Sequence, residues 1–232
     1  MSLVSSITGS IPNWCYRCKA YIPHQLKSHT DSLCQTCYTR LPTASESYCR
    51  HCGLDHQTAK CNHDLAAAID GFDYLYTYTD PIKGWISSLK YSKNFIAGRI
   101  LQTLISLWLD NNNEKFRSID HLVPIPISKR RLYLRGFNQT VYLLNTQTGL
   151  SLDLHCVKKI KHTPQQASLN RVERERIQKE SFGVIKDLRG KKILLFDDVC
   201  TTGHTLAEIS KSLKNDGVAE VHVLVLCRSL VQ

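Results

Sequence analysis

Apolar and polar residues follow one another in the C-terminal part of the chain in an order that predicts a strand, a helix and a second strand. Residues 193–196 form an apolar run long enough for a buried parallel strand. Apolar residues between 206 and 213 then recur at helical spacing, with Thr202 or Thr205 available as the N-cap. A second apolar run covers residues 221–226. Together these segments predict a βαβ unit.

Earlier segments show the same alternation of strand and helix patterns. Residues 71–80 alternate as a half-buried strand does, and Pro81 is placed to open a helix that reaches Lys90. A second helix is expected over residues 95–109 and another strand over residues 119–127. This order predicts an α/β domain with a mainly parallel sheet.

Two acidic residues and a hydroxyl-rich loop directly follow the strand at 193–196. Asp197 and Asp198 can accept hydrogen bonds from vicinal hydroxyls such as a ribose diol. The loop beyond them can surround a monophosphate with N–H and O–H donors at the start of a helix. Its candidate binding residues are Cys200, Thr201, Thr202, Gly203, His204 and Thr205. The segment resembles the phosphoribosyl pyrophosphate (PRPP) motif of type I phosphoribosyltransferases, which implies a sugar phosphate ligand.

A nucleotide hydrolase is the rival interpretation of this strand and its acidic residues. Such an enzyme needs a G-x-x-x-x-G-K-[ST] loop elsewhere in the chain. Gly190 and Lys191 form the only Gly-Lys pair, with no glycine five residues before it and no hydroxyl residue after it. The sequence therefore favours the sugar phosphate.

Length and charge restrict the class of protein. A chain of 232 residues with 42% hydrophobic content can bury one full core and support a small additional domain. The formal net charge of +10 favours polyanionic partners, either nucleic acid or phosphate-bearing substrates. The apolar segment 96–109 is interrupted by polar residues, and the N-terminus lacks a secretory signal pattern, so we expect no membrane insertion and a cytosolic location.

Seven of the ten cysteines lie before residue 62 and occur in a metal-binding pattern. Two C-x-x-C pairs separated by fifteen residues have the spacing of a structural zinc site, since each pair makes a tight turn whose thiolates converge. The predicted ligands are Cys15, Cys18, Cys34 and Cys37.

A third C-x-x-C pair predicts a second zinc site. Its thiolates would come from Cys49, Cys52 and Cys61, with His63 as the fourth ligand. Asp64, His56 and His51 are alternative fourth ligands, and the site could instead be degenerate and empty. Residues 1–65 contain too few periodic apolar residues for a core, so we predict a zinc-ribbon domain at 1–65 and an α/β domain at 66–232. Cys200, beside a predicted helix N-terminus, is a candidate for a reactive thiol of lowered pKa.

A basic segment follows the strand predicted at 119–127. Lys129, Arg130, Arg131 and Arg135 lie in the expected loop, where Arg135 can offer a planar fork to the oxygens of pyrophosphate. A solvated basic turn is the alternative.

Several motifs together make the chain similar to the ComF family of competence proteins. They are Leu122-Val-Pro-Ile-Pro, Arg131-Leu-x-x-Arg-Gly-Phe-Asn-Gln, Leu89-Lys90-Tyr91, Gln166-x-x-Leu169 leading to Arg174 and Ser181-Phe182, and the PRPP motif. The cysteine pairs resemble the double zinc ribbon of that family. Asp64 stands where the last ribbon cysteine is expected, and Ile177 stands where asparagine is common.

The resemblance implies a five-stranded, mainly parallel sheet of the type I phosphoribosyltransferase kind after a small zinc ribbon. It also implies roles for the candidate residues, with Mg2+ as a partner of PRPP. Asp197 and Asp198 would hold the ribose hydroxyls, the loop 201–205 the 5-phosphate, and Lys90 with Arg135 the pyrophosphate. A loop between residues 158 and 182 would close over the ligand, although a simple connecting helix explains the same pattern.

The implied function is that of a competence factor handling incoming single-stranded DNA in the cytosol. Other competence proteins, such as a DNA-uptake helicase, are the expected protein partners. Trp14, Tyr16, Tyr21 and Tyr38 could stack on bases, or could equally pack within the small domain. The alternatives are an active phosphoribosyltransferase of nucleotide or amide salvage, with Asp197, Asp198 and Arg135 as its catalytic residues, and a PRPP-responsive regulator.

Overall fold

The computed structural model describes residues 13–22, 32–45, 47–54, 64–145, 149–160 and 181–230, which fall into two compact units, 1–41 and 42–232. The first unit contains an antiparallel hairpin of β1 (Asn13–Trp14) and β2 (Tyr21–Ile22) followed by helix α1 (Gln35–Thr39). These elements are too short to enclose a core by themselves, so we expect the unit to depend on its cysteine side chains.

A parallel sheet forms the centre of the second unit. Its strands, in spatial order, are β3 (Gly71–Thr77), β8 (Glu220–Arg228), β7 (Lys192–Cys200) and β4 (His121–Pro124). Every neighbouring pair is parallel. The parallel α/β architecture predicted from the sequence is therefore confirmed.

The expected number of five strands is wrong for the described residues, because only four strands join this sheet. Where a fifth strand would pair with β4, a single parallel bridge joins Leu122 to Leu152. Pairing ends there because the Asp153 side chain accepts a hydrogen bond from the His155 N–H at 3.0 Å and turns the chain away.

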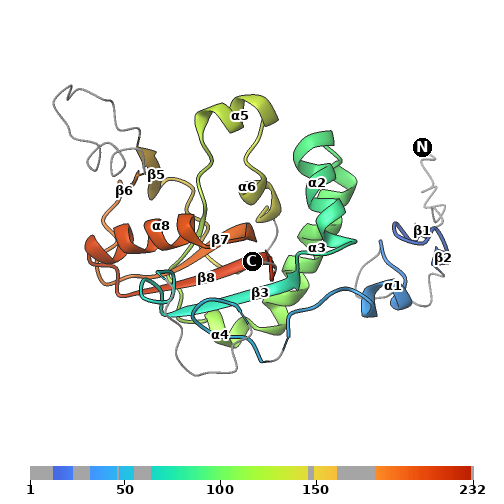
Figure 1. Cartoon of the computed structure of the whole chain (residues 1–232), viewed down its shortest axis with the longest axis horizontal. Helices are drawn as coiled ribbons and strands as arrows, with labels where there is room; N and C mark the ends of the chain where they lie inside the picture. The colour runs from blue at the N-terminus through green and yellow to red at the C-terminus, as the bar shows by residue number, and fades with distance from the viewer. Residues whose placement is uncertain are drawn as a thin grey trace, which may run out of the picture. The chain divides into compact units, whose positions relative to one another are not determined.

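Helices surround the sheet, and α8 lies along one of its faces (Figure 1). They are α2 (Ile82–Ser92), α3 (Phe95–Asn111), α4 (Asn113–Phe116), α5 (Lys129–Arg135), α6 (Gln139–Leu143) and α8 (His204–Asn215). A separate antiparallel pair consists of β5 (Val157–Ile160) and β6 (Ser181–Val184). Within the part of the chain that the structure describes, none of the helices is both long and apolar enough to cross a bilayer.

Strands β7 and β8 are apolar on both faces, as expected for a parallel sheet that is covered on both sides. Ile193 and Leu195 of β7 belong to the same buried cluster as Leu206 and Ile209 of α8. Leu194 and Phe196, which point to the opposite face, are also fully buried. The polar side chains that follow are therefore carried by a rigid central strand.

The basic segment after β4 is helical, so the predicted loop conformation is wrong. The Ser128 side chain caps α5 by accepting a hydrogen bond from the Arg131 N–H, and Gly136 ends the helix at φ 79°. The strand before it stops at Pro124, three residues earlier than predicted, because Pro124 and Pro126 lack the N–H groups that a ladder requires.

The compact units divide the chain at a different point from the domain boundary that we predict near residue 65. Cys49 and Cys52, assigned from the sequence to the zinc ribbon, lie in the unit of residues 42–232. The Phe72 N–H donates a hydrogen bond of 2.6 Å to the Arg50 carbonyl, and the Ala44 N–H donates one of 2.9 Å to Leu75. Residues 42–45 and 47–54 are thus attached to β3.

Candidate functional site

The loop between β7 and α8 lies at the carboxyl end of the parallel sheet, where ligands bind in open α/β folds. Asp197 and Asp198 are near the end of β7, and α8 begins at His204 directly after the loop. The N-cap of α8 is Gly203, in a left-handed conformation at φ 81°, and no side chain caps the helix. The prediction of Thr202 or Thr205 as the N-cap is therefore wrong.

An ion pair connects the acidic residues to α2. The Lys90 Nζ lies 2.6 Å from the Asp198 Oδ2, and both side chains are largely buried, with exposures of 15% and 5%. The structure thus brings together two predicted site residues that are more than one hundred positions apart in the sequence.

Asp197 lies in a different electrostatic environment from its neighbour. Burial raises the pKa of its carboxyl group, and the negative charge of Asp198 raises it further, to about 8. The Asp198 N–H donates a hydrogen bond to the Asp197 Oδ1 at 2.8 Å, which fixes the carboxyl group beside the strand end. Around neutral pH the two carboxyl groups of Asp197 and Asp198 therefore carry about one negative charge between them rather than two.

Cys200 does not have the reactive thiol that was predicted. Its side chain is 1% exposed, and burial raises the pKa of its thiol to about 11. Desolvation outweighs the field of the nearby helix N-terminus, so the thiol stays protonated. Only the backbone of Cys200 is in a position to contribute to the loop.

Arg135, at the end of α5, is held by two contacts. Its Nη1 donates a hydrogen bond to the Gln139 Oε1 at 2.7 Å, and its guanidinium group lies 5.6 Å from the centre of the Tyr91 ring. Since Tyr91 directly follows Lys90 on α2, the two cations predicted to bind pyrophosphate come from adjoining helices. Neither Tyr91 nor Gln139 was predicted as a partner of Arg135, although both lie in the quoted motifs.

The other residues of the Arg-Gly-Phe-Asn-Gln motif have structural roles. Phe137 packs against Phe95 and Tyr142, with ring centroids 5.6 and 5.8 Å apart. The Asn138 side chain caps α6 by accepting the Thr140 N–H, and it also donates to the Ile125 carbonyl at 3.3 Å. The motif thus fixes α5 and α6 to each other and to the end of β4.

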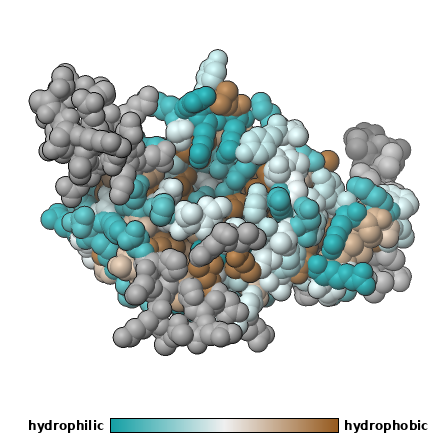
Figure 2. Space-filling view, viewed as in Figure 1, coloured by the Kyte–Doolittle hydropathy of each residue, from teal (hydrophilic) through white to brown (hydrophobic). Residues whose placement is uncertain are grey.

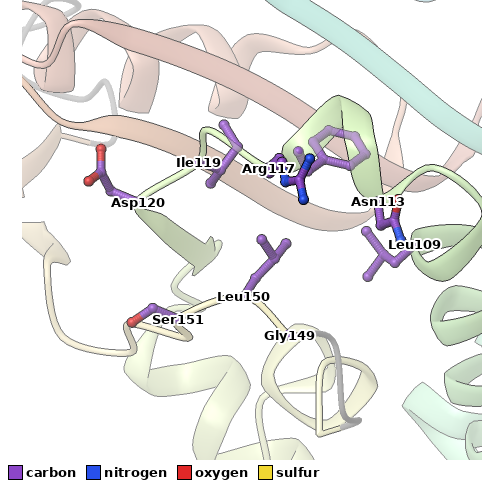
Figure 3. A pocket seen from close by; sticks show the side chains of 9 residues that line it. Leu109, Asn113, Arg117, Ile119, Asp120, Gly149, Leu150 and Ser151 are labelled. Carbon is purple, nitrogen blue, oxygen red and sulfur yellow. The ribbon is translucent and has the colours of Figure 1, made fainter.

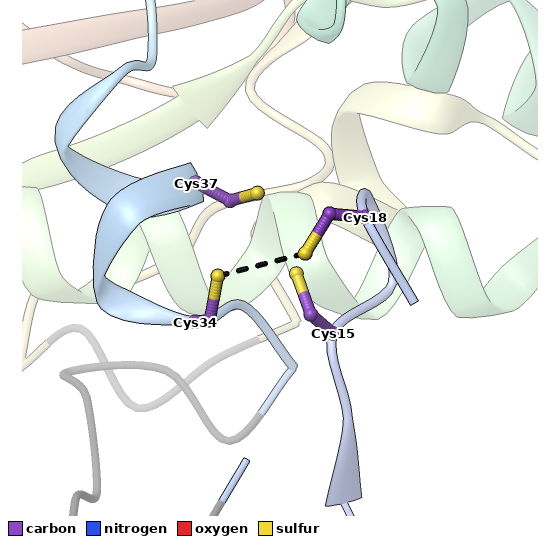
Figure 4. Close-up of side chains that lie close together, drawn as sticks. All are labelled: Cys15, Cys18, Cys34 and Cys37. Carbon is purple, nitrogen blue, oxygen red and sulfur yellow. Dashed lines mark hydrogen bonds between the residues drawn. The ribbon is translucent and has the colours of Figure 1, made fainter. Parts of the chain in front are cut away.

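The four cysteines predicted to bind zinc converge in the first unit, as Figure 4 shows. Their Sγ atoms all lie within 4.8 Å of one another, and those of Cys18 and Cys34 are 3.7 Å apart. Tetrahedral zinc with Zn–S bonds of about 2.3 Å requires sulfur atoms roughly 3.8 Å apart. The donor set and its spacing therefore fit a structural zinc ion.

The turn at Cys49–Leu54 has the same backbone hydrogen bonds as the turn at Cys15–Ala20. The Gly53 N–H donates to the Cys49 carbonyl at 2.8 Å, as the Lys19 N–H does to Cys15, and Gly53 and Lys19 both have positive φ. Cys61, His63 and the alternative ligand His56 lie outside the described residues. Asp64 is exposed and pairs with Lys211 at 3.7 Å. The second zinc site stays a prediction.

The proposed closing loop lies mostly outside the described residues, which omit 161–180. A pocket of about 400 Å3 lies elsewhere, between α4 and the segment Gly149–Ser151 (Figure 3). Asp120, which lines it, precedes β4, so this pocket is at the amino end of the strands. It is therefore separate from the loop after β7.

Comparisons with known proteins agree with this architecture. Residues 147–231 match the phosphoribosyl transferase domain family. The chain is 30% identical to competence protein F of Haemophilus influenzae, over 93% of this chain and 96% of that protein. It is 30% identical to DNA utilization protein YhgH of Escherichia coli K12, over 95% and 99% of the two chains. Identity to competence protein ComFC of Streptococcus pneumoniae is 27%, over 88% and 90%.

A solved structure titled as the allosteric regulatory enzyme of purine biosynthesis aligns with a TM-score of 0.37 and 18% identity, over 56% of this chain and 26% of that one. The fold assignment depends on the domain match and on the order of the parallel strands. Together they identify a type I phosphoribosyltransferase fold accompanied by a four-cysteine cluster.

Proposed function

The chain belongs to the family of competence protein F and DNA utilization protein YhgH, and on that basis we propose that it handles incoming single-stranded DNA in the cytosol and binds PRPP at the loop after β7. One observation carries this proposal. Helix α2 directs Lys90 inward to Asp198, while the next residue, Tyr91, is 75% exposed beneath the guanidinium group of Arg135. Helix α2 therefore carries a residue of the proposed phosphate site and, next to it, an exposed ring beside a cation, which are features suited to binding DNA.

The chemistry of the loop supports PRPP as the ligand. Two carboxyl groups near the end of β7 can hold a ribose diol, and the loop of threonines before α8 offers N–H and O–H donors to a phosphate. Lys90 and Arg135 are the cations available for the pyrophosphate. Mg2+ would neutralise part of that charge and fits the oxygen-rich donor set.

The charge of the surrounding helices supports a nucleic acid partner. Residues 81–109 and 121–152 contain eight Lys and Arg residues and no Asp or Glu. These segments are in contact, because Phe95 packs against Phe137 and the Gln102 Nε2 donates to the Tyr142 carbonyl at 2.6 Å. The exposed cations are Lys83, Lys93, Arg99, Lys129, Arg130 and Arg131.

Exposed aromatic and aliphatic side chains lie among these cations. On α5, Tyr133 is 89% exposed and Leu134 is 67% exposed, and Ile96 is exposed at the start of α3. Figure 2 shows hydrophilic residues gathered over α5 with hydrophobic ones among them. Cations that neutralise phosphates, beside rings that stack on bases, are the combination by which proteins hold single strands.

The DNA part of the proposal is tested by anisotropy of a labelled oligothymidine over a salt series. Arg130→Glu with Arg131→Glu should weaken binding by about tenfold or more and flatten the slope of log affinity against log salt by about 1.4. The control is the double variant Arg117→Glu with Arg189→Glu, which makes the same change in net charge at exposed positions outside α5. Equal losses in the two double variants would show that only net charge matters and would contradict this binding surface.

The PRPP part is tested by calorimetric titration with PRPP and Mg2+. Asp197→Asn with Asp198→Asn should abolish the binding heat, whereas Asp187→Asn, at an exposed turn, should leave it unchanged. Wild-type protein that gives no binding heat would refute the site. Release of pyrophosphate in the presence of candidate nitrogen nucleophiles would favour the second function, an active phosphoribosyltransferase.

A further inference from the structure

Arg228, at the end of β8, is a buried cation that the site described above does not use. Its side chain is enclosed, with the residue 3% exposed. Its Nε donates to the Cys52 carbonyl at 3.0 Å, and its Nη1 donates to the Cys200 carbonyl at 3.0 Å and to the Thr201 carbonyl. Among the described residues, no carboxylate pairs with this guanidinium group, so backbone carbonyls alone compensate the desolvation of its charge.

The hydrogen bond to Thr201 fixes the direction of its peptide group in the candidate phosphate loop, whereas the Cys200 carbonyl is held both by Arg228 and by the Ser229 N–H at 2.9 Å. In a trans peptide the C=O and the following N–H point in opposite directions. Because the Thr201 carbonyl is directed at Arg228, the N–H group of Thr202 is directed away from it. This N–H has no acceptor within the described parts of the chain.

The other contact of Arg228 attaches the loop to a rigid support. The Cys52 carbonyl belongs to the turn Cys49–Leu54, which is closed by the hydrogen bond from the Gly53 N–H to the Cys49 carbonyl. A methyl group on Gly53 would lie 2.3 Å from the Phe72 ring, so this turn is pressed against β3. Arg228 therefore joins the loop after β7 to a turn that β3 holds in place.

We infer that Arg228 is a positioning residue for phosphate binding: through the Thr201 carbonyl it turns the Thr202 N–H group toward the 5-phosphate, and it places a buried positive charge behind the loop. The inference rests on the proposed PRPP site and adds a residue to it. Backbone N–H groups of a turn bind anions in other phosphate-binding sites, and a cation behind them adds to the attraction.

The test compares two ligands that use different parts of the site, titrated calorimetrically into the full-length protein. Ribose 5-phosphate needs the loop, whereas magnesium pyrophosphate should bind through Lys90 and Arg135. Arg228→Gln should weaken ribose 5-phosphate binding by about tenfold or more while changing pyrophosphate binding by less than about twofold. Arg228→Lys keeps the charge and should recover part of the loss.

A control separates positioning from general destabilisation. Phe116→Ala removes a buried ring of α4, beside the pocket at the amino end of the strands, so it should lower the unfolding temperature without changing the affinity for ribose 5-phosphate. If Arg228→Gln does not fold, the Lys variant carries the comparison.

Two outcomes would overturn the inference. The first is wild-type affinity for ribose 5-phosphate in a folded Arg228 variant. The second is a parallel loss of both ligands. Wild-type protein that binds no ribose 5-phosphate would instead refute the PRPP site itself, and the inference with it.

Discussion

The Lys90 ammonium group lies 2.6 Å from the carboxylate of Asp198, and this ion pair joins helix α2 to the end of the central strand β7. Both side chains are largely shielded from water, so each charge depends on the other for compensation. A ligand at the proposed PRPP site that displaces Lys90 from Asp198 would therefore couple its binding to the position of α2.

Removing Lys90 should destabilise the protein because it leaves the Asp198 carboxylate buried without a cation. We expect Lys90→Met to lower the free energy of unfolding by about 3 kcal/mol, as when one partner of a buried pair is lost. Adding Asp198→Asn should recover more than half of that loss without restoring PRPP binding. Urea unfolding of the two variants measures both effects.

Lys83→Met is the matched control for this pair, since Lys83 is an exposed lysine on the same helix. Its effect on unfolding should stay within about 0.5 kcal/mol. If the losses of unfolding free energy in Lys90→Met and in Asp198→Asn added up to the loss in the double variant, the two side chains would not be coupled.

Zinc content should depend on the four-cysteine cluster of the first unit. Cys15→Ser or Cys37→Ser should lower the bound zinc by about one ion per chain, because three thiolates hold zinc far less tightly than four. Cys156→Ala removes a buried cysteine outside the cluster and should leave the zinc content unchanged. The measurement is the zinc content per chain after dialysis. A full complement of zinc in the Cys15 variant would contradict the assignment of this cluster as a zinc site.

Stability should fall as the pH rises, because of Asp197. The pKa of its carboxyl group is about 8 in the folded protein and near 3.8 in the unfolded chain. Between pH 3.8 and pH 8 this group is therefore protonated in the folded state and ionised in the unfolded state. The resulting stabilisation is complete below pH 4 and is lost as the pH rises through 8. Asp197→Asn should therefore be more stable than wild type at pH 9 by more than about 1 kcal/mol.

The pH profile of Asp187→Asn provides the opposite case. Hydrogen bonds from Arg189 lower the pKa of Asp187 to about 2. The stabilisation of the fold by the ionised Asp187 is therefore present above pH 4 and is lost only in acid. Between pH 5 and pH 9 this variant should follow the wild-type profile. If the Asp197 variant followed it too, the carboxyl group would not be protonated in the folded state at neutral pH.

Local patterns in the sequence were sufficient to predict the elements around the site. The apolar run before Asp197 and the helical spacing after Thr205 identify β7 and α8, since both elements bury periodic residues. Helix α5 was missed because the basic run suggested a loop, although Ser128 and Gly136 are typical of the two ends of a helix.

Features that depend on distant contacts could not be predicted in the same way. Lys90 and Asp198 were each assigned to the site, but nothing local shows that they form a pair. The Cys200 thiol is buried in a core cluster with residues distant in the sequence, so its raised pKa was missed. The contacts of Arg228 join positions 52, 200 and 201, which no spacing rule connects.

Gly203 provides a direct test of the loop after β7. It has φ 81°, and a methyl group added to it would lie 2.8 Å from the Leu65 Cδ2. Gly203→Ala should therefore combine backbone strain of about 1 kcal/mol with a steric clash that shifts the loop and weakens ribose 5-phosphate binding. Gly190→Ala is the matched control, because Gly190 has φ 71° and open space around it. The control should lose similar stability from strain and keep its affinity, while Leu65→Ala added to Gly203→Ala should relieve the clash. Normal ribose 5-phosphate affinity in Gly203→Ala, measured calorimetrically, would show that the loop does not hold the phosphate.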